Sequence, residues 1–233
     1  MTAARDRPRL ALLDASKSEH TRRNFRRELD ADLAEFDVTE NELPADFDFD
    51  GVVITGSRTS VYWDRDWIRP LLDYVAAADE RDLPILGVCY GHQALASALG
   101  GRVEDMGEYE IGYREIEKVG DDDLFEGIPE SFTAFTTHSD AVTELPPGAE
   151  LLAENDYGIH AFRRGDAWGV QFHPEYDRDT AATVTKGKDL PDERIQSVLD
   201  GIDRENYDAA CRTKRLFENF TSYVRQARKT PAQ

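Results

Sequence analysis

Apolar and polar positions along this 233-residue chain are arranged in short blocks that predict strands and helices in turn. The first strands are predicted at residues 10–13, 35–38, 51–55 and 83–86. Apolar residues recur at helical spacing over residues 19–33 and 67–78, and a helix-forming stretch follows at 94–99. This order predicts an α/β fold built on an open, mostly parallel sheet.

The second half of the chain has a different pattern. Polar and apolar residues alternate as in antiparallel strands at residues 114–117, 132–135, 149–153 and 159–163. These segments predict a small antiparallel extension of the sheet. Residues 207–228 return to helical spacing and predict the last helix. Because open sheets of this size commonly form one unit, residues 1–233 are expected to be a single domain.

The run Gly-Val-Cys-Tyr-Gly-His-Gln at residues 87–93 joins a predicted strand to a predicted helix. A cysteine between glycines at such a corner is the thiol form of the nucleophile elbow. The glycines allow the backbone segments to approach closely, and the start of the helix favours a thiolate at Cys89. A buried cysteine here is also consistent with inert packing.

A second cluster lies at residues 169–175, where an apolar strand ends at His173 and Glu175 follows two residues later. A thiol nucleophile needs a base, and the base needs a third group that orients it. Pro174 restricts the backbone on both of its sides, so one rigid turn can hold both side chains. The two clusters together favour a catalytic triad of Cys89, His173 and Glu175.

The runs Gly-Val-Cys-Tyr-Gly-His-Gln and Gln-Phe-His-Pro-Glu resemble the class I, triad-type glutamine amidotransferases, especially the glutaminase domain of GMP synthetase and its stand-alone relatives. The resemblance covers residues 10–175 and the last helix. It implies a flavodoxin-like sheet with helices on both faces. It also implies hydrolysis of the γ-amide of glutamine through a thioester at Cys89, and no cofactor is expected.

The resemblance further implies which residues surround the substrate. A Gly-rich loop after the strand at 51–55 donates one backbone N–H to the oxyanion hole in this family, and here the expected donors are Ser57 and Tyr90. Ser57 and Arg58 stand where many relatives have a glycine and a proline. The residues expected to bind the substrate are Gly56, Gln93, Thr137, Ser139 and Asp140.

Two features lie outside the triad. His138 falls within residues 136–140, which resemble a loop that closes over the substrate. Because the resemblance assigns the base to His173, His138 is interpreted as a loop or structural residue. Residues 176–206 form an extra segment before the last helix, with a helix predicted at 191–202. This segment is either an added solvated helix pair or a lid or docking surface beside the active site.

The charge of the chain excludes one class of partner. Its 47 acidic and 28 basic residues give a net charge of −19, which repels nucleic acid phosphates. Only six basic residues are lysines. Dense carboxylates with few lysines are expected in a salt-rich cytosol, so we predict a halophilic archaeal source.

Other absences in the sequence concern location and cofactors. No apolar stretch approaches the roughly 20 residues of a membrane span, and residues 1–8 lack the apolar segment of a signal peptide. Two cysteines, Cys89 and Cys211, form no disulfide framework, which suits a reducing cytoplasm. No Cys/His group has zinc spacing, so no structural metal is expected.

Three functions are compatible with these observations. The first is a glutaminase that passes ammonia to a separate synthetase, because the chain has no Gly-rich phosphate loop for acceptor chemistry. The second is a stand-alone γ-glutamyl peptidase, whose pocket beyond the γ-carbonyl would be lined by Arg58, Tyr62 and Trp63. The third is a regulatory module with an idle triad, favoured if no acyl-enzyme forms with an electrophilic glutamine analogue.

Overall fold

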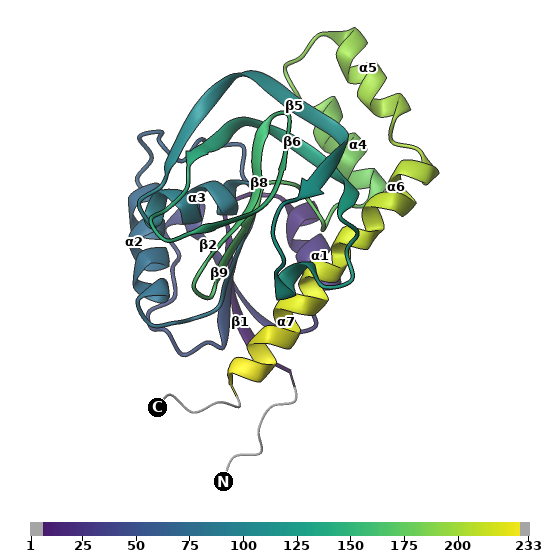
Figure 1. The fold of residues 1–233 in the computed structure, drawn as a ribbon. Coiled ribbons are helices and arrows are strands. Elements are labelled where there is room, and N and C mark those ends of the chain that lie inside the picture. The colour runs from purple at the N-terminus through teal and green to yellow at the C-terminus, as the bar shows by residue number, and fades with distance from the viewer. Residues whose placement is uncertain (1–6, 229–233) are drawn as a thin grey trace.

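The structure is a computed structural model that describes residues 7–228. It has one nine-stranded sheet with the strand order β2-β1-β3-β4-β9-β8-β7-β5-β6 (Figure 1). The strands are β1 (Arg9–Asp14), β2 (Asp32–Asp37), β3 (Gly51–Ile54), β4 (Ile85–Val88), β5 (Arg102–Lys118), β6 (Ser131–Glu144), β7 (Glu150–Asn155), β8 (Gly158–Arg164) and β9 (Ala167–Val170). The helices are α1 (Glu19–Glu28), α2 (Ile68–Asp79), α3 (Tyr90–Ala98), α4 (Arg178–Lys186), α5 (Asp192–Asp200), α6 (Arg204–Ala210) and α7 (Arg215–Ala227).

The sheet has a parallel part and an antiparallel part. Strands β2, β1, β3, β4 and β9 pair in parallel, and β9, β8, β7, β5 and β6 pair antiparallel. The α/β architecture is therefore as predicted. The extension is larger than the four short segments predicted, because β5 and β6 are 17 and 14 residues long. Most of β5 is exposed or half-buried and rich in charged residues. The pattern of apolar residues therefore predicted only a short part of this strand.

Both faces of the parallel strands are covered by helices, as the alternation of side chains requires. On one face, Leu10 and Leu12 belong to an apolar cluster with residues of α1 and α7. On the other face, Ala11 and Leu13 cluster with residues of α2 and α3. Burial of each such leucine contributes roughly 1.5–3 kcal/mol to folding, so the continuous apolar run at β1 specifies a doubly covered strand.

The first helix is shorter than predicted. The apolar spacing placed one helix over residues 19–33, but α1 ends at Glu28 and Leu33 lies in β2, where it pairs with Leu10. The N–H of Leu29 donates to the carbonyl of Phe25 at the end of the helix. Leu29 is buried beside α1, whereas Leu33 is a strand residue, so the four-residue spacing was coincidental beyond Leu29.

The predicted substrate loop at 136–140 is instead part of β6, and the prediction of a loop is wrong. Thr136, Thr137 and His138 pair with residues of β5 between Glu110 and Gly112. The threonines are β-branched, which suits an extended strand. These side chains are therefore held by a ladder of backbone hydrogen bonds and not by a free loop.

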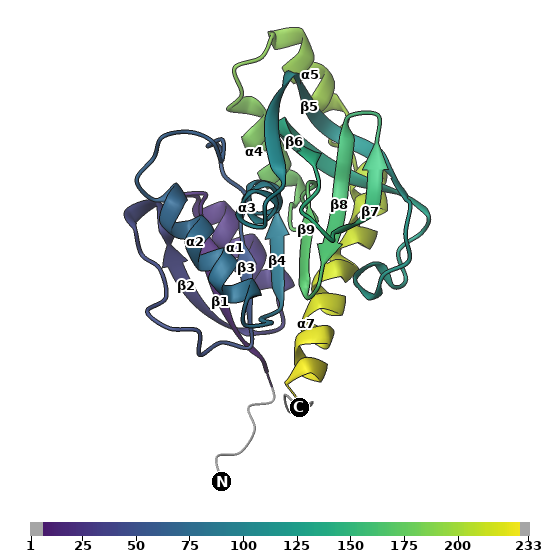
Figure 2. The same ribbon diagram turned by 60° about the vertical axis from the view of Figure 1, so that its left-hand side comes forward.

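The extra segment 176–206 contains more structure than the one helix predicted at 191–202. Helix α4 buries Thr180, Ala181 and Thr185, whereas α5 has no buried residue. Both helices pack on β5 and β6 through a small apolar cluster that includes Ala181 and Ile202. Figures 1 and 2 show α4 and α5 beside one end of the β5–β6 ladder. Helix α4 is thus not a purely solvated addition.

The last helix, predicted at 207–228, is divided. Helix α6 ends at Ala210, a 3₁₀ turn covers Cys211–Lys214, and α7 follows. The Thr213 hydroxyl donates to the carbonyl of Ala210 at 2.7 Å within this turn. Over residues 7–228, no helix is both long enough and apolar enough to cross a bilayer. Most of the segment on which the signal-peptide prediction rests, residues 1–6, lies outside the described residues.

Candidate active site

Cys89 lies between the end of β4 and the start of α3. Its backbone has φ 55° and ψ −103°, a conformation that costs a non-glycine residue energy. The conformation is held from both sides, because the N–H of Cys89 donates to the carbonyl of Val170 at 2.8 Å and its carbonyl accepts from the N–H of Gln93 at 3.1 Å. Such a strained corner presents a nucleophile at the carboxyl edge of the sheet.

The glycines on either side of Cys89 are required by close backbone contacts. A Cβ atom at Gly87 would lie 2.3 Å from the carbonyl oxygen of Gly91. A Cβ atom at Gly91 would lie 2.3 Å from the carbonyl oxygen of Ile54 on β3. A side chain at either position would overlap a backbone carbonyl. The corner therefore requires glycine at both positions, as predicted.

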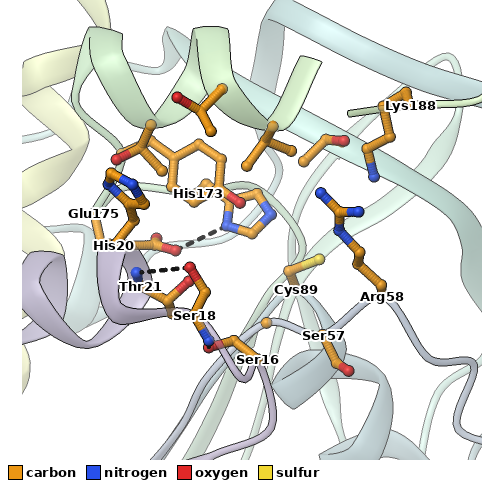
Figure 3. A pocket seen from close by; sticks show the side chains of 16 residues that line it. Ser16, Ser18, His20, Thr21, Ser57, Arg58, Cys89, His173, Glu175 and Lys188 are labelled. Atoms are coloured by element: carbon orange, nitrogen blue, oxygen red, sulfur yellow. Dashed lines mark hydrogen bonds and ion pairs between the residues drawn. The ribbon is translucent and has the colours of Figure 1, made fainter. Parts of the chain in front are cut away.

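His173 and Glu175 follow β9 and form a hydrogen bond of 2.8 Å between Nδ1 and Oε1. The N–H of His173 donates to the carbonyl of Phe135 at 2.8 Å, which fixes the turn against β6. Figure 3 shows the Cys89 side chain next to the His173 ring, on the side away from Glu175. A Cβ atom placed on Gly56 would lie 3.1 Å from Cε1 of His173 and 3.9 Å from Sγ of Cys89, so both side chains lie next to Gly56. The structure therefore brings the three predicted catalytic residues together.

The electrostatic environment favours a protonated His173. Burial by itself lowers the pKa of His173, but the negative charges of Cys89 and Glu175 outweigh it and raise the pKa from 6.5 to about 10. A raised pKa in the folded state stabilises the fold fully below about pH 6.5, and this stabilisation is lost as the pH rises toward about 10. An imidazolium is also the acid that a departing amine needs.

We expect Glu175→Gln to lower the pKa of His173 from about 10, because one of its two negative neighbours is removed. A triad residue of this kind supports catalysis by about 10³- to 10⁴-fold. The titration of the His173 ring, followed by NMR, and the pH profile of kcat/KM measure both effects. Exposed Glu218→Gln is the matched control. An unchanged His173 titration in E175Q would contradict the charge assignment.

Two supporting residues near the triad carry no motif in the sequence. The ring of Tyr176 stacks on His173 with centroids 4.0 Å apart. On α1, Arg27 donates from Nη2 to the carbonyl of Glu175 at 2.7 Å. It also donates from Nη1 to Asp177 at 2.9 Å. These contacts link helix α1 to the turn after His173, and only the tertiary structure reveals them.

The predicted oxyanion loop follows β3 and lies against Cys89. Gly56 faces the sulfur of Cys89 and the imidazole of His173, as the distances above show. Gly56 and Ser57 line a first cavity together with Cys89 and His173. Tyr90 is the first residue of α3, so its N–H is among those left without an intrahelical partner. Its buried ring packs on Trp67 with centroids 5.6 Å apart. Both predicted donors therefore belong to segments next to the sulfur.

Four of the five predicted substrate-binding residues line a second cavity, which also contains Cys89, whereas Gly56 lines only the first. The second cavity is lined by Gln93, Thr137, Ser139 and Asp140, among others. The amide nitrogen of Gln93 is already engaged, because it donates to the carbonyl of Asp140 and to Oε1 of Gln171, both at 3.0 Å. Asp140 accepts from the Tyr62 hydroxyl at 2.8 Å. Gln93 thus also braces the wall of the cavity.

A buried group of three side chains lies behind this wall. Atoms of Glu110, His138 and His160 that could bind a metal lie within 4.8 Å of one another. Oε2 of Glu110 is 2.5 Å from Nε2 of His138, and Oε1 accepts from Asn155 at 2.7 Å. The Nδ1 atom of His138 donates to the carbonyl of Asp140 at 2.9 Å.

These contacts give Glu110 and His138 a structural role in the wall. Burial favours the neutral form of Glu110, but hydrogen bonds to His138 and His160 outweigh it and lower the pKa of Glu110. The three groups come from β5, β6 and β8, so sequence spacing could not reveal them. The absence of a structural metal therefore stays a prediction. The interpretation of His138 as a structural residue agrees with its contacts.

Comparison with known proteins gives the family. The family profile described as glutamine amidotransferase class-I matches residues 12–186. A GMP synthase (glutamine-hydrolysing) of Azoarcus sp. is 34% identical over 170 residues, which cover 68% of this chain and 30% of that protein. γ-Glutamyl peptidase 5 of Arabidopsis thaliana is 36% identical over 155 residues, which cover 62% of each chain. The matched region thus spans less than a third of the GMP synthase.

Solved structures support the fold. A glutamine amidotransferase of Thermotoga maritima superposes with a TM-score of 0.78 over 92% of this chain and 98% of that chain, at 23% identity. A glutamine amidotransferase of Methylobacillus flagellatus superposes with a TM-score of 0.76 over 94% and 95%, at 20% identity. With the family profile covering most of its length, this chain belongs to the class I glutamine amidotransferase family.

Proposed function

We propose that this protein is a glutaminase that hydrolyses the γ-amide of glutamine through a thioester on Cys89. The observation that carries the proposal is the His173–Glu175 hydrogen bond of 2.8 Å beside Cys89, at a cavity lined by all three residues. A thiol, an imidazole and an orienting carboxylate are the groups that acyl transfer requires.

In the first half of the reaction, the Cys89 sulfur attacks the amide carbon of glutamine. The carbonyl oxygen becomes an oxyanion, and the N–H groups of Ser57 and Tyr90 stabilise it by about 3 kcal/mol each. The His173 imidazolium gives its Nε2 proton to the amide nitrogen, and ammonia leaves. Glu175 keeps Nδ1 protonated and the ring oriented throughout.

In the second half, His173 acts as a base. It takes a proton from water, the resulting hydroxide attacks the thioester carbon, and the bond to sulfur breaks. Glutamate leaves and the thiolate–imidazolium pair is restored. The Nε2 atom of His173 is available for this step, because it has no hydrogen-bond partner among the described residues.

The ammonia would pass to a separate synthetase subunit. This part of the proposal is supported by the GMP synthase of Azoarcus sp., of which the matched region covers 30%. The remainder of a synthetase would have to be a partner of this chain or a further region. The cytoplasmic location and the salt-rich archaeal source remain predictions from composition, and a single domain over residues 1–233 remains one as well.

A γ-glutamyl peptidase is the second candidate, and one observation favours it. The cavity at Cys89 has a volume of about 120 Å³ in all, and Thr180, Thr183 and Val184 line the part of it where a leaving group larger than ammonia would lie. The similarity to the γ-glutamyl peptidase covers 62% of both chains.

The experiment that tests the proposal measures ammonia release from glutamine and amino acid release from γ-glutamyl dipeptides, in molar salt. A chloroketone analogue of glutamine is added in parallel, and its site of attachment is found by mass spectrometry. Labelling of Cys89 with slow glutamine turnover supports the partner-dependent glutaminase. Fast dipeptide cleavage supports the peptidase. Absence of both labelling and hydrolysis would contradict an enzymatic role and favour the idle module.

A further inference from the structure

Two cavities meet at Cys89, and the cationic side chains of Arg58 and Lys188 line both of them. The first cavity reaches α1 and α4, and the second reaches β5 and β6. The residues that line both are Ser57, Arg58, Cys89, Thr137 and Lys188. Figure 3 shows Arg58 and Lys188 entering from opposite directions on the side of Cys89 away from Glu175. A substrate whose scissile bond lies at the sulfur therefore extends past these two side chains.

Neither cation has a carboxylate partner within residues 7–228. Arg58 is exposed and makes no hydrogen bond or ion pair to any of these residues. Lys188 donates to the hydroxyl of Tyr109, and its ammonium lies 4.8 Å from the centre of that ring. Both contacts are to the side chain of Tyr109, and neither is to a carboxylate. The whole chain has 47 acidic side chains, yet none of those among the described residues forms an ion pair with either cation.

The acidic groups that line the cavities are engaged or exposed. Glu175 is buried and bonded to His173, and Asp140 accepts from Tyr62. Asp189 is exposed beside Lys188 and lines only the second cavity. The first cavity therefore contains no carboxylate other than that of Glu175, and its mouth is positively charged.

The position of Arg58 is restricted by its neighbour across the mouth. A Cβ atom at Gly187 would lie 2.9 Å from Nη2 of Arg58, so the guanidinium passes closely over the backbone of the extra segment. Gly187 and Lys188 both belong to residues 176–206. The extra segment thus places one cation and makes room for the other, which gives it a part in the active site.

We propose that Arg58 and Lys188 form a carboxylate-binding subsite at the mouth of the active site. The proposal rests on the γ-amide hydrolysis proposed above. A guanidinium binds a carboxylate through two parallel hydrogen bonds, and an ammonium adds a point charge. The carboxylate has two possible sources, the α-carboxylate of the glutamyl group and the carboxylate of an amino acid leaving group in a γ-glutamyl dipeptide.

Four substrates separate these sources: glutamine, glutamine α-amide, γ-glutamylglycine and γ-glutamylglycinamide. The kcat/KM value of each is measured for the unchanged enzyme, Arg58→Gln and Lys188→Gln. Loss of a charged hydrogen bond is expected to lower kcat/KM about 10- to 100-fold for substrates with the recognised carboxylate only. Arg69→Gln on α2 and Lys186→Gln, two residues before Lys188, are the matched controls, because neither side chain lines the cavities.

The pattern of losses decides the source. A loss for glutamine and γ-glutamylglycine that disappears with glutamine α-amide assigns the subsite to the α-carboxylate. A loss for γ-glutamylglycine that disappears with γ-glutamylglycinamide assigns it to the leaving group. Equal losses for all four substrates, or none, would overturn the subsite.

A second measurement does not depend on hydrolysis. Cys89 is alkylated with anionic iodoacetate and with neutral iodoacetamide. The rate with iodoacetate divided by the rate with iodoacetamide is then compared among the same variants. We expect R58Q and K188Q to lower this ratio about 10-fold, since a nearby cation attracts the anion. An unchanged ratio would overturn the subsite even if no natural substrate is cleaved. Failure of hydrolysis with a lowered ratio would instead contradict only the proposed function.

Discussion

The variant Cys89→Ala is expected to lose γ-amide hydrolysis by on the order of 10⁴- to 10⁶-fold, because no thioester can form without the sulfur. The fold is expected to remain, since alanine keeps the Cβ atom and the side chain is small. Ammonia release measured with excess protein gives the residual rate, and thermal unfolding by circular dichroism gives the stability. Activity equal to that of the unchanged protein would contradict the assignment of Cys89 as nucleophile.

The backbone of Cys89 supplies a matched comparison. Because φ is 55°, a glycine at this position removes strain that alanine keeps. We therefore expect Cys89→Gly to be more stable than Cys89→Ala by about 1 kcal/mol, with both variants inactive. A glycine variant less stable than the alanine variant would show that the corner is not strained as its dihedral angles indicate.

The variant Gly87→Ala is expected to have the largest effect on stability. Its Cβ atom would lie 2.3 Å from the oxygen and 2.5 Å from the carbon of the Gly91 carbonyl, and 2.9 Å from the N–H nitrogen of His92. These are backbone atoms of α3, so the helix must move away from β4. We expect a loss of about 3 kcal/mol or more, which lowers the melting temperature by roughly 6–12 °C in a chain of this size.

The control for this prediction is Gly201→Ala at the end of α5. Its Cβ atom would lie 3.4 Å from the nearest atom, the carbonyl oxygen of Val198, which is ordinary contact. The melting temperature of G201A is expected to stay within about 2 °C of that of the unchanged protein. Equal melting temperatures for G87A and the unchanged protein would contradict the close packing of the corner.

The sequence predicted the parallel part of the fold well, and physical reasons explain why. Strands β1, β3 and β4 are buried on both faces, so each is a short apolar run that composition alone marks. Prediction was weaker where residues are half-exposed. The charged strand β5 and the strand position of Thr136–Asp140 were missed because their pairing is set by partners distant in the chain.

The sequence also indicated the proposed catalytic residues, and the limits of that prediction follow from the same principle. Cys89 with its glycines, and His173 with Glu175, are local patterns whose spacing reflects a corner and a turn. The stacking of Tyr176 on His173 and the support of Glu175 by Arg27 have no local signature. Lys188 likewise lies 99 residues after Cys89 and carries no motif, because its position depends on how α4 packs.

By itself, the sequence therefore determined the class of fold, the glycine-flanked corner at Cys89 and the turn that carries His173. These features depend on backbone conformation and burial within a few residues, which a local pattern records. Only the tertiary structure decided that the Thr136–Asp140 segment is a strand, that Glu110, His138 and His160 converge, and that Arg58 and Lys188 lie together beside Cys89. Each of these depends on contacts between elements far apart in the chain, which are set by the packing of the whole sheet and its helices.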